Sequence, residues 1–128
     1  MKRYDLHSHT RYSRCSNIKP VDYLKVAKKR GLNGIAVTDH NTIKGALEVA
    51  KLNKGDEDFE VIIGSEIKTN YGEVLAYYLN EEIKPGNFFD VVDGVRNQDG
   101  LISVSHPFDL TRQHYSKKQL NEVIRHVD

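Results

Sequence analysis

Two histidines stand one residue apart near the start of the chain, in the stretch DLHSHT. Side chains at positions i and i+2 of a β-strand point to the same face, so His7 and His9 would present two imidazoles to one point. Imidazole nitrogens bind transition metals well, and two of them placed in this way form a chelating pair. The alternative is that both are half-exposed polar residues at the end of a strand, and the pair alone does not decide between the two.

Further residues that can hold a metal stand directly after later apolar runs of the sequence. They are Asp39 and His40, Glu66, and His106. Polar residues commonly end strands. That tendency does not explain why four of the six histidines and a glutamate all stand at the ends of predicted strands. If the strand ends converge on one face, these side chains meet there, and we therefore predict a shared metal site.

Two further residues, Asp39 and Cys15, are either metal ligands or have a structural role. Asp39 is either a metal ligand or a residue that orients an imidazole, and we favour the second. Cys15 is either a soft metal ligand or an inert buried thiol, of which the second is commoner. We expect His114 to lie in a solvated loop and His126 on the surface of the last helix.

Short apolar runs alternate with amphipathic stretches along the chain. Strands are predicted at 4–9, 34–38, 59–64 continuing through Glu66, 73–79 and 101–105. Helices are predicted to begin at Pro20, Ile43, Phe88 and Ser116, and glycines at 31, 55 and 100 end the first three. Asn70-Tyr71-Gly72 would be the turn of a hairpin. Alternating strands and helices favour a parallel sheet in an α/β fold, either doubly wound or a (β/α) barrel.

The composition narrows the class of protein. The 128 residues suffice for one domain, and a net charge of +1 gives no broad electrostatic case for nucleic acid. A single cysteine excludes an intrachain disulfide, and no apolar run approaches the ~20 residues of a membrane helix. The first residues lack the charged-then-apolar pattern of a signal peptide, and we expect a cytoplasmic protein. No glycine-rich phosphate-binding motif is present, which weakens the nucleotide-binding open-sheet folds.

Four stretches in order resemble the motifs of the polymerase and histidinol phosphatase (PHP) superfamily: DLHSHT, AVTDHNTIKGALEVA, VIIGSEI and SVSHPF. The resemblance spans nearly the whole chain. It implies a distorted (β/α)7 barrel, of which about four βα units are present here as a partial barrel. It also implies a cluster of up to three divalent metal ions (zinc, manganese or iron) and metal-dependent hydrolysis of phosphoesters.

The same resemblance implies roles for particular residues. Glu66 would bridge two metals and act in catalysis together with Asp39. The metal ligands would be His7, His9, His40, Glu66 and His106. The candidates for binding substrate phosphate, in loops at the rim of the site, would be Arg11, Arg14 and Lys44.

The sequence departs from the family pattern in two ways. Tyr12-Ser13-Arg14 leads to Cys15, where the family often has an aspartate or histidine ligand, so a third metal would be missing or unusual. The family's later ligands, a further histidine and an Asp-x-His, are also not present. We therefore expect residues 1–128 to be a single PHP-like domain that is the N-terminal half to two-thirds of a longer one. Such a chain would expose sheet edges, form homo-oligomers and have little activity alone.

The predicted function is that of a metal-dependent phosphoesterase acting on a phosphomonoester or phosphodiester through a metal-activated water. We expect its partner to be a phosphorylated small molecule or a short nucleic acid, with a nucleotide or short oligonucleotide favoured, and no membrane. One alternative is an amidohydrolase-like metal hydrolase, which also opens with His-x-His, although the Glu66 and Thr38-Asp39-His40 motifs argue against it. The other is a non-catalytic PHP-like module for binding or assembly.

Overall fold

The computed structural model describes residues 1–128. The strands are β1 (Tyr4–Asp5), β2 (Gly34–Val37), β3 (Glu60–Lys68), β4 (Glu73–Tyr77) and β5 (Leu101–Val104). The helices are α1 (Pro20–Lys29), α2 (Lys44–Leu52), α3 (Phe88–Arg96) and α4 (Lys117–Val123). Each strand and helix that the sequence predicts is therefore present. No helix combines the length and the apolar character that a membrane span requires.

The strands form one curled, open sheet in the order β1-β2-β3-β4-β5. The first three strands run parallel, whereas β4 is antiparallel to both β3 and β5. The sheet is mixed rather than purely parallel, because β3 and β4 form the hairpin that Asn70-Tyr71-Gly72 predicts. Since β5 thus points the same way as β1, β2 and β3, the carboxyl ends of these four strands lie along one edge. This arrangement is the α/β, partial PHP-type barrel that the sequence predicts.

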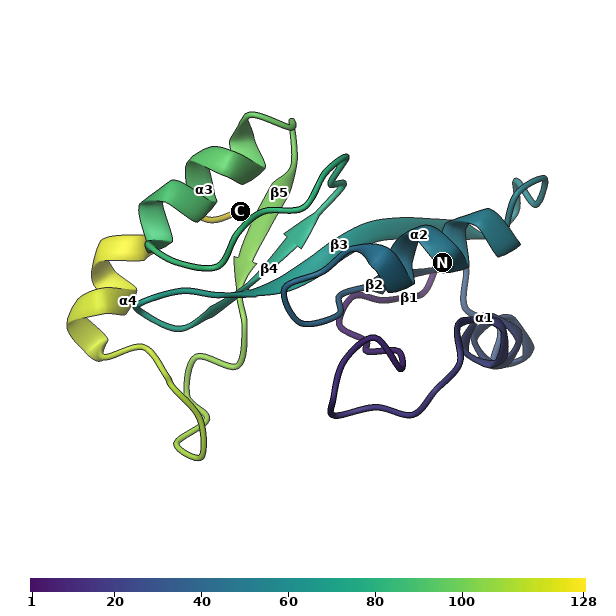
Figure 1. Cartoon of the computed structure of the whole chain (residues 1–128), viewed down its shortest axis with the longest axis horizontal. Helices are drawn as coiled ribbons and strands as arrows, with labels where there is room; N and C mark the ends of the chain where they lie inside the picture. Colours follow the sequence, from purple (N-terminus) through teal and green to yellow (C-terminus); the bar gives the residue numbers. More distant parts are fainter.

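The long strand β3 joins two halves of the molecule, each with its own core (Figure 1). Its first residues pair with β2 and its last residues pair with β4. Helices α1 and α2 pack on the β2 half, around buried residues such as Ile35 and Val49. Helices α3 and α4 cover the β4 and β5 half, where Phe88 and Ile102 are fully buried. The segments that follow β2 and β5 therefore extend from two separately packed halves, which β3 joins.

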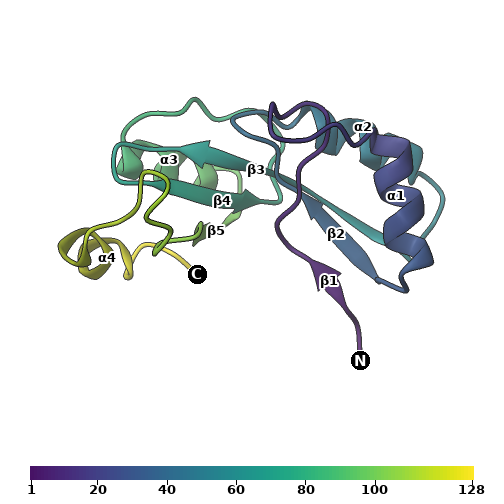
Figure 2. The ribbon, with the colours of Figure 1, turned by 90° about the horizontal axis from the view of Figure 1, so that it is seen from below.

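The first strand is shorter than the sequence predicts, because the chain leaves the regular ladder after Asp5. It stays beside β2 through Ser8, whose N–H donates to Thr38 Oγ1 at 3.0 Å and whose carbonyl accepts from the Thr38 N–H at 2.8 Å. Ser8 is buried, whereas His7 is exposed and His9 is half-buried. Figure 2 shows this segment continuing from β1 past the end of β2 before it turns back toward α1. The two histidines are thus held at the end of the sheet rather than within a strand.

The last helix ends before His126, which the sequence predicts to lie on its surface. A capping box formed by Ser116 and Gln119 begins α4, as the sequence predicts, but the helix ends at Val123. Ile124, the next residue, is 69% exposed. The chain instead returns to the sheet, where the Asp128 N–H donates to the Ile102 carbonyl at 2.8 Å. Pairing with β5 therefore replaces the final helical turn.

Loop 10–19 is fastened to the sheet by the buried carboxylate of Asp39. Asp39 Oδ1 accepts from the Thr10 N–H at 2.7 Å and from Ser13 Oγ at 2.6 Å. Its other oxygen, Oδ2, accepts from Thr10 Oγ1 at 2.6 Å. Ser13 Oγ in turn accepts from the backbone N–H of His40 at 3.0 Å. This network fixes the loop against the residues that follow β2.

The start of α2 passes so close to this network that only glycine fits at position 45. A Cβ atom at Gly45 would overlap Asp39 Oδ2 and would lie 2.5 Å from Thr10 Oγ1. We expect Gly45→Ala to lower the free energy of unfolding by about 1–3 kcal/mol, because the helix or the network must shift. Chemical denaturation measures this change.

A matched control is Gly94→Ala in α3, where the nearest atoms belong to the flexible side chain of Ile83 at 3.3 Å or more. There the helix gains intrinsic propensity, and we expect a change of less than about 1 kcal/mol. Equal destabilisation by the two variants would contradict the role given to Gly45.

Candidate metal centre

The fully buried carboxylate of Glu66, in β3, lies at the centre of four imidazoles. Its Oε2 atom is 3.1 Å from His7 Nε2 and 3.1 Å from His9 Nε2. The same oxygen is 3.5 Å from His40 Nδ1. Its Oε1 atom is 2.8 Å from His106 Nε2. The structure thus brings all five residues that the sequence suggested as metal ligands into one cluster, referred to below as the Glu66 cluster.

Four strands place these side chains, which stand after β1, β2 and β5 and, for Glu66, within β3. His40 follows β2 and forms an isolated parallel bridge with Glu66, in which the Glu66 N–H donates to the Asp39 carbonyl at 3.0 Å. His106 follows β5 with φ of +26°, a conformation that costs energy for a non-glycine residue and is found at functional sites. Ser105, just before it, donates its hydroxyl to Glu66 Oε1. The imidazoles therefore converge through backbone positions that the sheet and the adjacent turns fix.

The surroundings of Glu66 decide its charge. Burial alone would raise the pKa of this carboxyl, but hydrogen bonds from His7, His9 and Ser105 outweigh burial and hold its pKa below the ordinary value. The hydrogen bond with Glu66 also raises the pKa of His7. Glu66 is consequently an anion at neutral pH, suited to accept hydrogen bonds or hold a cation rather than to donate a proton.

A second carboxylate, Glu73, belongs to the site and was missed from the sequence. Its Oε1 is 3.4 Å from His40 Nδ1, and its Oε2 is 3.2 Å from His106 Nε2. Glu73 opens β4 and pairs with Lys68, two residues after Glu66, so both glutamates share one face of the sheet. The signal that could have found it is the register of the hairpin around its predicted turn.

The donor atoms of the cluster fit a divalent cation. His7 Nε2 and His9 Nε2 lie 3.1 Å apart and face the same carboxylate oxygen, an arrangement that needs a proton or a cation between them. His7, His9 and Glu66 form one group whose ligand atoms lie within 4.8 Å of one another. A second such group comprises His40, Glu66 and Glu73. Imidazole and carboxylate ligands suit zinc, manganese and iron.

Comparison with known proteins agrees with this geometry. The family model of the PHP domain matches residues 5–127. The chain belongs to the PHP domain family. Its fold is also that of a crystal structure from Bifidobacterium adolescentis, described as a candidate metal-dependent phosphoesterase, with a TM-score of 0.77. That match is 16% identical in sequence and covers 99% of this chain and 76% of the other.

Several proteins are similar to this chain in sequence. An uncharacterized protein of Methanocaldococcus jannaschii, MJ1587, is 41% identical over 115 residues, which are 81% of this chain and 67% of that protein. A second one from the same organism, MJ0417, is 39% identical over 114 residues, 87% of this chain and 42% of the other. A 5'-3' exoribonuclease of Haemophilus influenzae is 36% identical over 70 residues, 55% of this chain and 25% of the enzyme. The PHP domain described here thus spans 67% or less of each of these relatives.

The cationic residues at the rim of this PHP domain differ in their surroundings. Arg14 lines a shallow pocket together with His40. Arg11, in contrast, faces Glu48 of α2, with 3.7 Å between Nη2 and Oε1, and the side chain of Lys44 forms no hydrogen bond or ion pair. Arg112, which no sequence motif indicates, has its Nη1 atom 3.3 Å from His106 Nε2. Of the cations near the cluster, Arg14 and Arg112 therefore lie beside the imidazoles.

Asp39, suggested as a catalytic residue, has both carboxylate oxygens occupied. They accept the three hydrogen bonds from Thr10 and Ser13 described above. The carboxylate is 1% exposed and is not among the groups whose ligand atoms gather for a metal. These hydrogen bonds hold loop 10–19 in place. Through Ser13 they also hold the backbone of His40 in place.

Proposed function

We propose that the Glu66 cluster is the active site of a metal-dependent phosphoesterase that hydrolyses a phosphomonoester or phosphodiester. The observation that carries the proposal is the fully buried, anionic Glu66 with imidazole nitrogens 2.8–3.5 Å from its oxygens. Membership of the PHP family supports it, as does the likeness in fold to a candidate metal-dependent phosphoesterase.

The residues of the chain have distinct parts in this proposal. His7, His9, His40, His106, Glu66 and Glu73 would hold the metal. A divalent cation in such a site supplies Lewis-acid chemistry, activating water and stabilising negative charge on phosphoryl oxygens. Glu66 keeps the ligand set anionic, and Ser105 holds its carboxylate in place. Arg14 and Arg112 would bind the phosphoryl oxygens, because guanidinium groups form strong charge-assisted hydrogen bonds with phosphate.

We further propose a nucleotide or short oligonucleotide as the substrate. The relative from Haemophilus influenzae is a 5'-3' exoribonuclease, and a PolC-type DNA polymerase III of Latilactobacillus sakei is 31% identical over 84 residues, 64% of this chain and 6% of that protein. The loop after His106 also carries two strongly exposed apolar side chains, Phe108 at 78% and Leu110 at 80%. An exposed aromatic ring two residues after His106 offers a surface on which a base can stack.

This substrate class predicts that Phe108→Ala weakens the binding of nucleotides but not of substrates without a base. Loss of one stacked base costs about 1–3 kcal/mol, so we expect KM for a dinucleotide to rise about 5- to 150-fold. KM for p-nitrophenyl phosphate, which has no base, should stay within about twofold. Steady-state kinetics with both substrates measures the difference. An equal change for the two substrates would remove the argument for stacking.

The proposed activity is tested with metal-free protein, before and after addition of Mn²⁺ or Zn²⁺. The substrates are p-nitrophenyl phosphate and bis-p-nitrophenyl phosphate, with a p-nitroanilide as the control. Phosphoester hydrolysis that appears only with metal supports the proposal, and turnover in the chelated protein contradicts it. Turnover of the anilide alone would favour the amidohydrolase alternative. Metal binding without hydrolysis of any substrate would favour the non-catalytic module.

A further inference from the structure

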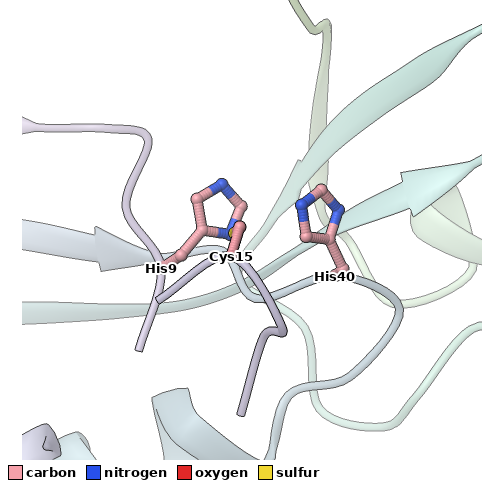
Figure 3. Close-up of side chains that lie close together, drawn as sticks. All are labelled: His9, Cys15 and His40. Atoms are coloured by element: carbon pink, nitrogen blue, oxygen red, sulfur yellow. The ribbon is translucent and has the colours of Figure 1, made fainter. Parts of the chain in front are cut away.

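Cys15, the only cysteine of the chain, lies beside two imidazoles of the metal centre. Its Sγ atom and a ring nitrogen from each of His9 and His40 all lie within 4.8 Å of one another. Figure 3 shows the three side chains close together, although they come from the segment after β1, from loop 10–19 and from the segment after β2. A nitrogen–nitrogen–sulfur group of this kind is a ligand set in its own right.

The placement of the thiol follows from hydrogen bonds that fix the loop on both sides of it. Before Cys15, Ser13 is tied to the carboxylate of Asp39 at 2.6 Å. Across the loop, the Arg11 N–H donates to the Ile18 carbonyl at 2.8 Å, and the Ser16 N–H donates to the Ser13 carbonyl at 3.1 Å. The turn that carries Cys15 is therefore closed at its base and anchored to the same strand end that carries His40.

The backbone of this turn also sets the distance between the thiol and the imidazoles. His40 donates its N–H to Ser13 Oγ at 3.0 Å, and His9 has its Nδ1 atom 3.4 Å from the same hydroxyl. One serine thus contacts both histidines, two residues before the cysteine. The rings of His9 and His40 stack with 4.6 Å between their centroids, so the two imidazoles lie against each other beside the turn that carries the thiol.

We propose that Cys15, His9 and His40 form a thiolate-containing metal site that takes zinc in preference to manganese or magnesium. Thiolate is a soft ligand that selects zinc, whereas carboxylate, carbonyl and water oxygens suit manganese and magnesium. The site deepens the proposed function, because it shares His9 and His40 with the Glu66 cluster. Cys15 accordingly gives one side of the metal centre a different metal preference from the carboxylate side.

The test uses the metal-free chain and its single thiol. Free Cys15 is exposed and should react readily with a thiol reagent such as dithionitrobenzoate. Since a thiolate bound to a metal is no longer available as a nucleophile, saturating Zn²⁺ should slow this reaction at least about tenfold, and Mn²⁺ should leave it within about twofold. A rate that Zn²⁺ does not change, or that Mn²⁺ slows as much as Zn²⁺, overturns the proposal.

Cobalt provides a second measurement that does not depend on reactivity. The Co²⁺-loaded chain should show a thiolate-to-cobalt charge-transfer band in the near ultraviolet, and Cys15→Ser and Cys15→Asp should lose this band. The visible bands of Co²⁺ held by histidine and carboxylate should remain in both variants. If the unsubstituted chain shows the visible bands but no near-ultraviolet band, the thiolate site is rejected. Metal binding by the Glu66 cluster is then still supported. Absence of both kinds of band, with no protection of the thiol, rejects metal binding altogether.

Discussion

Glu66→Gln is expected to weaken metal binding by more than about 100-fold and to remove metal-dependent hydrolysis. Changes to groups that merely orient metal ligands already cost about 10–100-fold in affinity or activity, and Glu66 contacts all four imidazoles directly. Glutamine keeps the shape of the side chain but removes the negative charge around which the histidines gather. Metal content after dialysis, isothermal titration and the phosphoester assay measure the effect.

The matched control is Glu60→Gln on the same strand, where the side chain is exposed and remote from the cluster. It should bind metal and hydrolyse substrate as the unsubstituted chain does. Circular dichroism and thermal melting of the two metal-free variants show whether the fold is kept. Equal metal content in Glu66→Gln, Glu60→Gln and the unsubstituted chain would contradict the central role of Glu66.

The sequence predicts those members of the Glu66 cluster that stand at or near the carboxyl end of a strand. His40 and His106 follow strands of the same direction, and Glu66 lies near the carboxyl end of a third, so all three share one edge of the sheet. The alternation of strand and helix was therefore sufficient to bring them together. For His7 and His9 the spacing identified the pair, but the reason was different. They lie beyond β1, and Ser8 between them anchors the segment to Thr38.

The residues that the sequence did not reveal depend on details finer than element order. Glu73 reaches the cluster because the β3–β4 hairpin pairs it with Lys68, and a shift of one residue would turn it to the opposite face. Arg112 approaches His106 from an irregular loop that carries no periodic pattern. The short β1 was also unforeseen, because beyond Asp5 the hydroxyl groups of Ser8 and Thr38 take part in hydrogen bonds between the two segments in place of a regular ladder. The pattern of apolar residues thus does not determine strand register, loop conformation or side-chain hydrogen bonds.

Asp39→Ala is expected to lower the free energy of unfolding by about 3–5 kcal/mol, since three donors lose their acceptor and each unsatisfied buried donor costs about 1–3 kcal/mol. The donors are the backbone N–H and hydroxyl of Thr10 and the hydroxyl of Ser13, and both residues are buried. For a domain of this size the melting temperature should fall by about 10–20 °C. Chemical denaturation and calorimetry of the metal-free chain measure the change.

Two control variants, Asp39→Asn and Asp58→Ala, test whether the lost hydrogen bonds cause the destabilisation. The alternative is that loss of any acidic residue destabilises the chain. Asparagine keeps one acceptor oxygen, and the Thr10 hydroxyl can rotate to accept from its amide, so a smaller loss is expected than with alanine. Asp58 is exposed and its side chain accepts no hydrogen bond, so Asp58→Ala should change stability by less than about 0.5 kcal/mol. Amide exchange at Thr10 and His40 should quicken in Asp39→Ala, because these N–H groups donate within the network. A stable Asp39→Ala protein with unchanged exchange at both positions would show that loop 10–19 is held by other contacts, and that Asp39 is free to act in the chemistry instead.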